Sequence, residues 1–207
     1  MSESNRKEKS LSDTQTHSYT ALLVMDMQVG IVTRYTQTGD FLTPTSTAIT
    51  AARTASIPVI YVVVAFRPGY PEVSLRNKVF SATKQQQSSL SAPMINMEIH
   101  PAIAPQPTDI VVMKRRVSAF SGSDLEVVLR AQDITHLVLC GIATSGVVLS
   151  TLREAADKDY QLTVLADCCF DNDEEVQRVL LSKVFPRQAE VVQVSAWMAK
   201  LNAREIQ

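Results

Sequence analysis

Two ionisable side chains each come directly after a short apolar segment of this sequence. Asp26 follows residues 21–25, and Lys114 follows residues 109–113. A carboxylate at the end of an apolar strand is costly unless it is paired or hydrogen-bonded. If the two strands are near neighbours, Asp26 and Lys114 can share one pocket and stabilise each other's charged forms. The alternative is a solvent-exposed strand end or a purely structural ion pair.

A third candidate is the loop 141–148, which joins the apolar segment 136–140 to a helical pattern. Backbone N–H groups at the start of a helix favour an anion or a developing oxyanion. The alternative is an ordinary turn capped by Thr144 or Ser145. The loop matches neither a G-x-G-x-x-G fingerprint, a phosphate-binding loop nor a G-x-S-x-G elbow. We therefore expect no nucleotide and no other cofactor.

Cysteine and histidine give no further catalytic or metal site. The three cysteines are odd in number and too few for a disulfide scaffold, so we expect strand-end packing positions in a reducing interior. They are Cys140, Cys168 and Cys169. The three histidines lack metal-ligand spacing, and we predict no metal site. They are His17, His100 and His136.

Short apolar runs alternate with amphipathic segments from Tyr19 onward. The predicted strands are residues 21–25, 58–66, 109–113, 136–140, 162–166 and 191–194. The predicted helices are residues 43–56, 124–132, 147–159, 173–185 and 196–201, the first capped by Thr43 with Pro44 in its first turn. Strands without polar alternation are buried on both faces, and alternation with helices implies parallel pairing. The predicted fold is α/β, a three-layer α/β/α (Rossmann-like) architecture with a six-stranded parallel sheet.

This architecture brings the candidates together, because ligands of open parallel sheets bind beyond the carboxyl ends of the strands. Asp26, Lys114 and the loop 141–148 all occupy such ends. Residues 67–107 lack clear periodicity. A stretch of that length inside a compact domain is predicted to be an elaborated active-site loop or an interface.

Composition narrows the range of partners. The chain has 207 residues, 45% of them hydrophobic, and a net charge of −1, which excludes nucleic-acid binding through bulk basicity. The longest apolar stretch, residues 57–66, is too short to span a bilayer, so we expect no membrane partner. Residues 1–18 are polar and predicted to form a disordered tail, with one domain over residues 19–207. The tail lacks the apolar centre of a secretory signal, which favours a cytoplasmic protein and leaves unconventional secretion open.

Five segments together carry a resemblance to a known family. They read ALLVMDMQ at 21–28, EIHP at 98–101, KRRVSAFSGS at 114–123, CGIATSGVVLSTLREA at 140–155 and VLAD at 164–167. In this order and at these separations the chain resembles the isochorismatase-like (cysteine hydrolase) family from Tyr19 to Leu201. The resemblance implies a parallel six-stranded sheet, a homodimer or homotetramer, and a site built from aspartate, lysine and usually cysteine.

The resemblance assigns the family's aspartate to Asp26 and its lysine to Lys114. The family's nucleophilic cysteine usually lies three residues after the threonine of the loop, Thr144 here, and that position holds Val147. The metal-binding Asp–His–His stretch of nicotinamidases is also missing, since the chain reads FRPGYPEVSLRN there. Amide hydrolysis through a thiolate adduct is therefore not expected, because valine offers no lone pair.

True isochorismatases also lack the cysteine, and they cleave the enol ether of isochorismate. By resemblance, Asp26 would be the general acid, with Lys114 and the loop amides binding a small carboxylate substrate and Val147 forming an apolar wall. Gly146 would allow close approach of the ligand. The residues predicted to contact the substrate are Gln28, Arg67, Thr144, Ser145, Gly146 and Val147.

Two alternatives stay open. The missing thiol is also compatible with a non-catalytic member that binds a small molecule or forms an oligomeric scaffold. A third hypothesis uses Ser145 or Thr144 as the nucleophile, although no histidine base lies nearby in the sequence.

Overall fold

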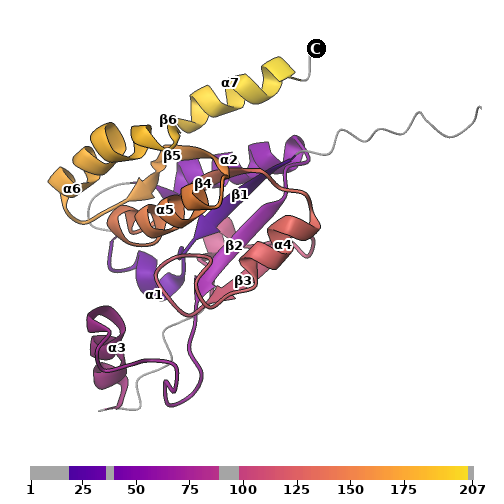
Figure 1. Ribbon diagram of the computed structural model, residues 1–207. Coiled ribbons are helices and arrows are strands. Elements are labelled where there is room, and N and C mark those ends of the chain that lie inside the picture. The colour runs from indigo at the N-terminus through magenta and orange to yellow at the C-terminus, as the bar shows by residue number, and fades with distance from the viewer. Residues whose placement is uncertain (1–18, 36–39, 89–97, 205–207) are drawn as a thin grey trace, which may run out of the picture.

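A single parallel sheet organises the molecule (Figure 1). The computed structural model describes residues 19–35, 40–88 and 98–204. Six strands lie in the order β3-β2-β1-β4-β5-β6, and all five neighbouring pairs are parallel. The strands are β1 (Thr20–Met25), β2 (Val59–Val64), β3 (Ile110–Lys114), β4 (His136–Ile142), β5 (Gln161–Phe170) and β6 (Glu190–Val192). The predicted α/β architecture is confirmed, and the tail predicted for residues 1–18 lies outside the described residues.

Helices cover both faces of this sheet (Figure 1). One face carries α2 (Leu42–Thr54) and α7 (Val194–Arg204), which contact each other, and the other carries α4 (Leu125–Ala131) and α5 (Leu149–Asp157). The shorter elements are α1 (Val29–Val32), η1 (Pro101–Ile103), the π-helical turn η2 (Thr144–Val148), α6 (Glu174–Val179), η3 (Leu180–Val184) and η4 (Phe185–Arg187). Because both faces are covered, every residue of β1 is buried.

Two predicted boundaries are wrong for identifiable reasons. α2 begins at Leu42 rather than at a Thr43 cap, because the carboxylate of Asp40 accepts the Thr43 N–H at 3.0 Å. β5 continues past the predicted end at Ala166 because Asp167 does not terminate it. The Asp167 carboxylate accepts the Val194 N–H at the start of α7, at 3.0 and 3.3 Å. The strand then runs on through two buried cysteines.

Residues 66–88, here called the arm, leave the end of β2 and carry α3 (Lys78–Ser88). α3 stands apart from the three layers, on the side where α1 follows β1 (Figure 1). The Glu98 carbonyl accepts the Val29 N–H at 2.9 Å, and an antiparallel bridge joins Gln28 to Ile99. The arm therefore starts at the carboxyl edge of the sheet, and residues 98 and 99 lie at the same edge.

β1 and β4 approach each other closely at this edge. Gly141 has a φ of +155°, and a Cβ there would lie 2.5 Å from the carbonyl oxygen of Met25. Only glycine fits such an approach. Within the three described segments, no helix is long and apolar enough to cross a bilayer.

Candidate functional site

The strand order reverses between β1 and β4, and a cavity lies at the carboxyl ends of these strands. In open α/β sheets this reversal is where ligands bind. The cavity has a volume of about 250 Å³, slightly below the usual range for a ligand site. One side, here called the sheet wall, is formed by residues at or just beyond the ends of β1 to β4. They are Asp26, Val64, Lys114, Ile142 and Val147.

Asp26 and Lys114 meet in this wall, although β2 lies between the two strands that they follow or end. The Lys114 Nζ lies 2.8 Å from the Asp26 Oδ2, and both side chains are at least nine-tenths buried. The ammonium also donates to the carbonyls of Arg116 and Val117, each at 2.9 Å. An ammonium has three N–H donors, so these three acceptors use all of them.

The other Asp26 oxygen is differently placed. Oδ1 is buried and makes no hydrogen bond to any described part of the chain. Burial raises the pKa of Asp26 from 3.8 to about 6, against the lowering effect of the Lys114 charge and its hydrogen bond. A carboxyl group with that pKa gains and loses a proton near neutral pH, as general acid–base catalysis requires.

The backbone turns sharply at Asp26, which has a φ of +56°. Aspartate tolerates this left-handed conformation better than most residues. The Asp26 N–H donates to the Val62 carbonyl at 2.8 Å, which ties the turn to the neighbouring strand. The carboxylate is therefore held on the rigid sheet.

The loop after β4 forms the floor of the cavity through Gly146 and Val147. A Cβ at Gly146 would meet only the Ala143 Cβ at 3.7 Å, so the space above it is open. The Ser145 N–H donates to the Asp171 Oδ2 at 2.7 Å, and the Gly146 N–H donates to the Ala143 carbonyl at 3.0 Å. Two of the backbone amides predicted to bind substrate carboxylates are thus already engaged within the protein.

Four predicted contacts do not lie in the cavity lining. Thr144 is fully buried with a hydroxyl that has no partner among the described residues, and Ser145 is exposed outside the lining. Gln28 is buried, donates to the Val64 carbonyl at 3.2 Å and accepts its N–H at 2.8 Å. Arg67 is exposed and pairs with Glu72 at 3.3 Å. The structure therefore gives Gln28 and Arg67 roles in holding the ends of β1 and the arm.

Sequence reasoning missed the residues that complete the cavity. The side formed by the arm, here called the arm wall, consists of Phe66, Val79 and Phe80. Next to α1 the lining is Ile31, Arg34 and Tyr35. The only available signal was apolar residues in an aperiodic stretch, which does not show where they pack.

The cysteines and histidines lie away from this chemistry. All three cysteines are buried, and burial raises the pKa of each thiol. His136 begins β4, about 20 Å of strand away from its carboxyl end. Its ring nitrogens contact the hydroxyls of Thr20 and Thr163, at 3.2 and 2.9 Å. Over the described ranges, no cluster of three or more His, Cys, Asp or Glu side chains could hold a metal ion.

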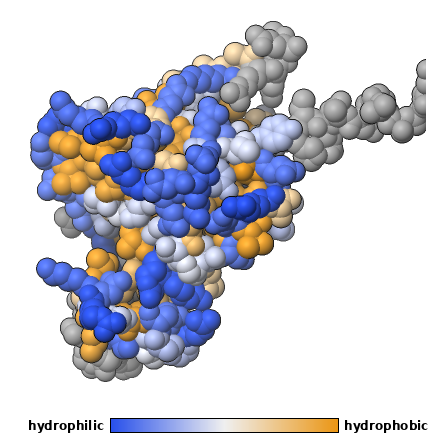
Figure 2. Space-filling view, in the orientation of Figure 1, coloured by the Kyte–Doolittle hydropathy of each residue, from blue (hydrophilic) through white to orange (hydrophobic). Residues whose placement is uncertain are grey.

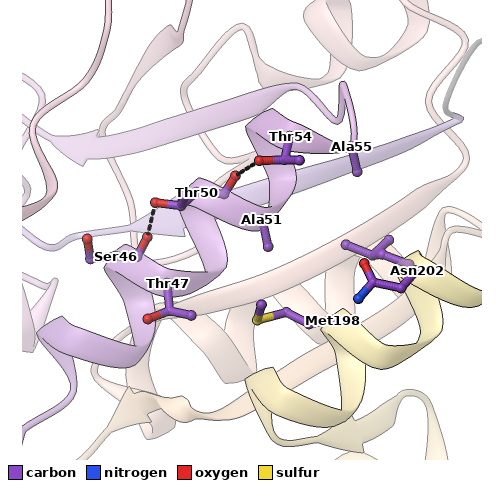
Figure 3. Close-up of a pocket in the computed structure, with 9 residues that line it drawn as sticks. Ser46, Thr47, Thr50, Ala51, Thr54, Ala55, Met198 and Asn202 are labelled. Carbon is purple, nitrogen blue, oxygen red and sulfur yellow. Dashed lines mark hydrogen bonds between the residues drawn. The ribbon is translucent and has the colours of Figure 1, made fainter.

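A larger cavity, about 330 Å³, lies between α2 and α7. Figure 3 shows Ser46, Thr50 and Thr54 in line along α2, with Thr47 and Ala51 on the side of that helix that faces Met198 of α7. The Thr50 and Thr54 hydroxyls donate to the helix's own carbonyls at 2.9 and 3.0 Å. No ionisable side chain lines this groove. Its size alone therefore does not make it the better candidate for a reaction.

Comparison with known proteins identifies similar sequences. A family model described as the isochorismatase domain matches residues 20–196. The uncharacterized isochorismatase family protein YwoC of Bacillus subtilis is 34% identical over 168 residues, which is 81% of this chain and 86% of that protein.

Solved structures give the same result. An isochorismatase family protein from Burkholderia thailandensis is 31% identical, with a TM-score of 0.73, over 89% of this chain and 96% of that one. A cysteine hydrolase from Pseudomonas syringae pv. phaseolicola is 25% identical, with a TM-score of 0.78, over 89% and 93%. The matched region of this chain includes the cavity and both charged residues of its sheet wall.

Proposed function

Because the chain belongs to the isochorismatase family of hydrolases, we propose that it hydrolyses a small carboxylate substrate with Asp26 as general acid and without a thiol nucleophile. The enol ether of isochorismate, or of a related small carboxylate, is the substrate class that fits this chemistry. The observation that carries the proposal is the state of the Asp26 carboxyl group. One of its oxygens is held by Lys114, and the other is buried beside the cavity without a hydrogen-bond partner among the described residues.

The reaction needs one proton and one water molecule. Asp26 donates its proton to the vinyl carbon of the enol ether, which leaves an oxocarbenium ion at the ether-bearing carbon. Water adds to that carbon, and its proton returns to the Asp26 carboxylate. The resulting hemiketal collapses to pyruvate and the ring diol, so Asp26 ends the cycle as it began.

The surroundings of Asp26 suit this cycle. Its raised pKa of about 6 keeps a useful fraction of the acid form near neutral pH. Lys114 fixes the orientation of the carboxyl group and stabilises the carboxylate that forms after proton transfer. Val147 and Phe80 line the cavity with apolar surface. Such surface suits a carbocyclic ring and limits the water around the reacting atoms.

The position of Val147 separates this proposal from thiol chemistry. The family's nucleophile would stand at Val147, which lines the cavity together with Asp26 and Lys114. The serine or threonine alternative has less support. Ser145 is exposed outside the lining, and neither His100 nor His136 lies in the lining to serve as its base.

The test is turnover of isochorismate by the full chain, followed as pyruvate release with a coupled lactate dehydrogenase. Asp26→Asn keeps the shape of the side chain and an acceptor for Lys114 but removes the ionisable proton. We expect its kcat/KM to fall about a thousandfold. The matched control is Asp157→Asn, an exposed carboxylate on α5, which should keep full activity.

Two results would contradict the proposal. Turnover by the wild type that equals turnover by Asp26→Asn would remove Asp26 from the reaction. No turnover at all, together with a thermal shift on adding isochorismate, would favour the non-catalytic binding protein.

A further inference from the structure

A carboxylate substrate needs a cation in the cavity, and Lys114 is not free to be that cation. All three of its donors are used, by Asp26 and by the carbonyls of Arg116 and Val117. Binding a substrate carboxylate through Lys114 would require breaking one of these buried bonds. Loss of a buried hydrogen bond to a charged group is costly. The charge that recognises the substrate must come from another residue.

Three arginines in or next to the arm, Arg67, Arg115 and Arg116, are also engaged. Arg67 and Arg115 both pair with the Glu72 carboxylate, at 3.3 and 3.2 Å. Arg116 donates to the Glu72 carbonyl at 2.9 Å and to the Arg115 carbonyl at 2.7 Å. None of these three side chains lines the cavity.

Arg34 differs from these three arginines both in its position and in its partners. It lies just beyond α1 and lines the cavity on the side next to that helix. Its guanidinium makes no hydrogen bond or ion pair with any residue that the structure describes. Burial is the largest influence on the pKa of the neighbouring Tyr35 hydroxyl and raises it; the charges of Asp171 and Asp26 also raise it, and the charge of Arg34 lowers it. Arg34 and Asp26 both line the cavity.

We propose that Arg34 determines specificity by binding the substrate's carboxylate, while the arm wall and Val147 contact its apolar body. The inference rests on the proposed function for the identity of the substrate, but not for the existence of the binding site. A guanidinium offers a planar pair of donors that matches a carboxylate. The predicted ligand is therefore a small, largely apolar molecule with one carboxylate at the Arg34 end of the cavity.

The test compares two probes of nearly equal shape, benzoate and benzamide, by isothermal titration calorimetry at pH 7.5. We expect the wild type to prefer benzoate, and Arg34→Gln to weaken benzoate binding about tenfold without changing benzamide binding. Arg34→Lys should restore part of the loss, because a charge without the planar fork retains only part of the recognition. Arg76→Gln, an exposed arginine of the arm outside the lining, is the matched control and should bind as the wild type does.

Three results would overturn the proposal. They are a wild type that does not bind benzoate, an equal loss of both probes in Arg34→Gln, and a loss of benzoate binding in Arg67→Gln but not in Arg34→Gln. The outcome is separable from that of the proposed function. Arg34-dependent benzoate binding without turnover of isochorismate would reject the reaction and keep Arg34 as the carboxylate-binding residue.

Discussion

The two walls of the cavity are built in different ways. The sheet wall takes one residue from the end of each of four strands and one from the following loop, and it continues the hydrophobic core. The arm wall consists of three residues from a segment that leaves the body. On this segment Val79 is 64% and Leu75 72% exposed. Figure 2 shows apolar residues on this protruding lower part of the molecule as well as on the body.

If the proposed function holds, the sheet wall carries out the reaction and the arm wall contacts the ligand. The charged pair lies in the wall that the sheet holds in place. Burial there raises the pKa of Asp26, and the ion pair with Asp26 holds Lys114. The two phenylalanines of the lining, Phe66 and Phe80, lie in the arm wall together with the exposed Val79, so they can change with little effect on the fold. Substitutions in the sheet wall should therefore affect stability strongly, and those in the arm wall should affect ligand binding more than stability.

The largest expected effect follows from breaking the buried pair with Lys114→Met. The change leaves the buried Asp26 carboxylate without its partner and removes the donor to two partly buried carbonyls. We expect a loss of about 3–5 kcal/mol in the free energy of unfolding at pH 7, measured by urea denaturation. Lys200→Met breaks an exposed pair with Glu190 and should have no measurable effect. If the two variants were equally stable, the buried pair of Asp26 and Lys114 would contribute no more to stability than an exposed ion pair does.

The next effect is a pH dependence of stability that comes from Asp26. Its pKa rises from 3.8 to about 6 on folding, so the folded state holds this proton more tightly than the unfolded state does. Below pH 3.8 this stabilisation of the folded state is fully present, and it is lost as the pH rises through 6. One pKa unit corresponds to about 1.4 kcal/mol, so the loss amounts to about 3 kcal/mol.

The measurement compares urea unfolding of the wild type and Asp26→Asn between pH 3.5 and 7.5. The contributions of the other titrating groups cancel in the difference between the two proteins. The free energy of unfolding of the variant should therefore increase relative to that of the wild type as the pH rises. Parallel curves would mean that the pKa of Asp26 is the same in both states.

The same contrast between the walls explains what the sequence could predict. Asp26 and Lys114 were found because each follows an apolar run, and parallel strands bring their carboxyl ends to one edge. The strand order then joins the loop after β4 to them. The first inference needs only local patterns and parallel pairing, whereas the order of the strands comes from the structure.

Arg34 and Phe80 could not be found in this way. Arg34 follows a helix of four residues, and the chain around it is positioned by an antiparallel bridge between Gln28 and Ile99, 71 positions apart. Phe80 lies on an arm whose path depends on long-range contacts. Gln28 was predicted to contact the substrate but does not line the cavity. A polar side chain near a candidate catalytic residue can equally well satisfy the backbone of a nearby strand, here that of Val64.

The smallest expected effect on stability tests the arm wall. Phe80 packs edge-on against Phe66, with ring centroids 5.1 Å apart, and is only partly buried. Phe80→Ala should cost about 1 kcal/mol in urea denaturation, the size of a single aromatic contact. The matched core variant Phe185→Ala removes a fully buried ring and should cost about 3–5 kcal/mol.

Ligand binding should show the reverse order of effects, since Phe80 lines the cavity and Phe185 does not. Phe80→Ala should therefore weaken benzoate and benzamide alike by several fold, whereas Arg34→Gln weakens only benzoate. If Phe80→Ala were as destabilising as Phe185→Ala, the arm would be part of the core and the distinction between the two walls would fail.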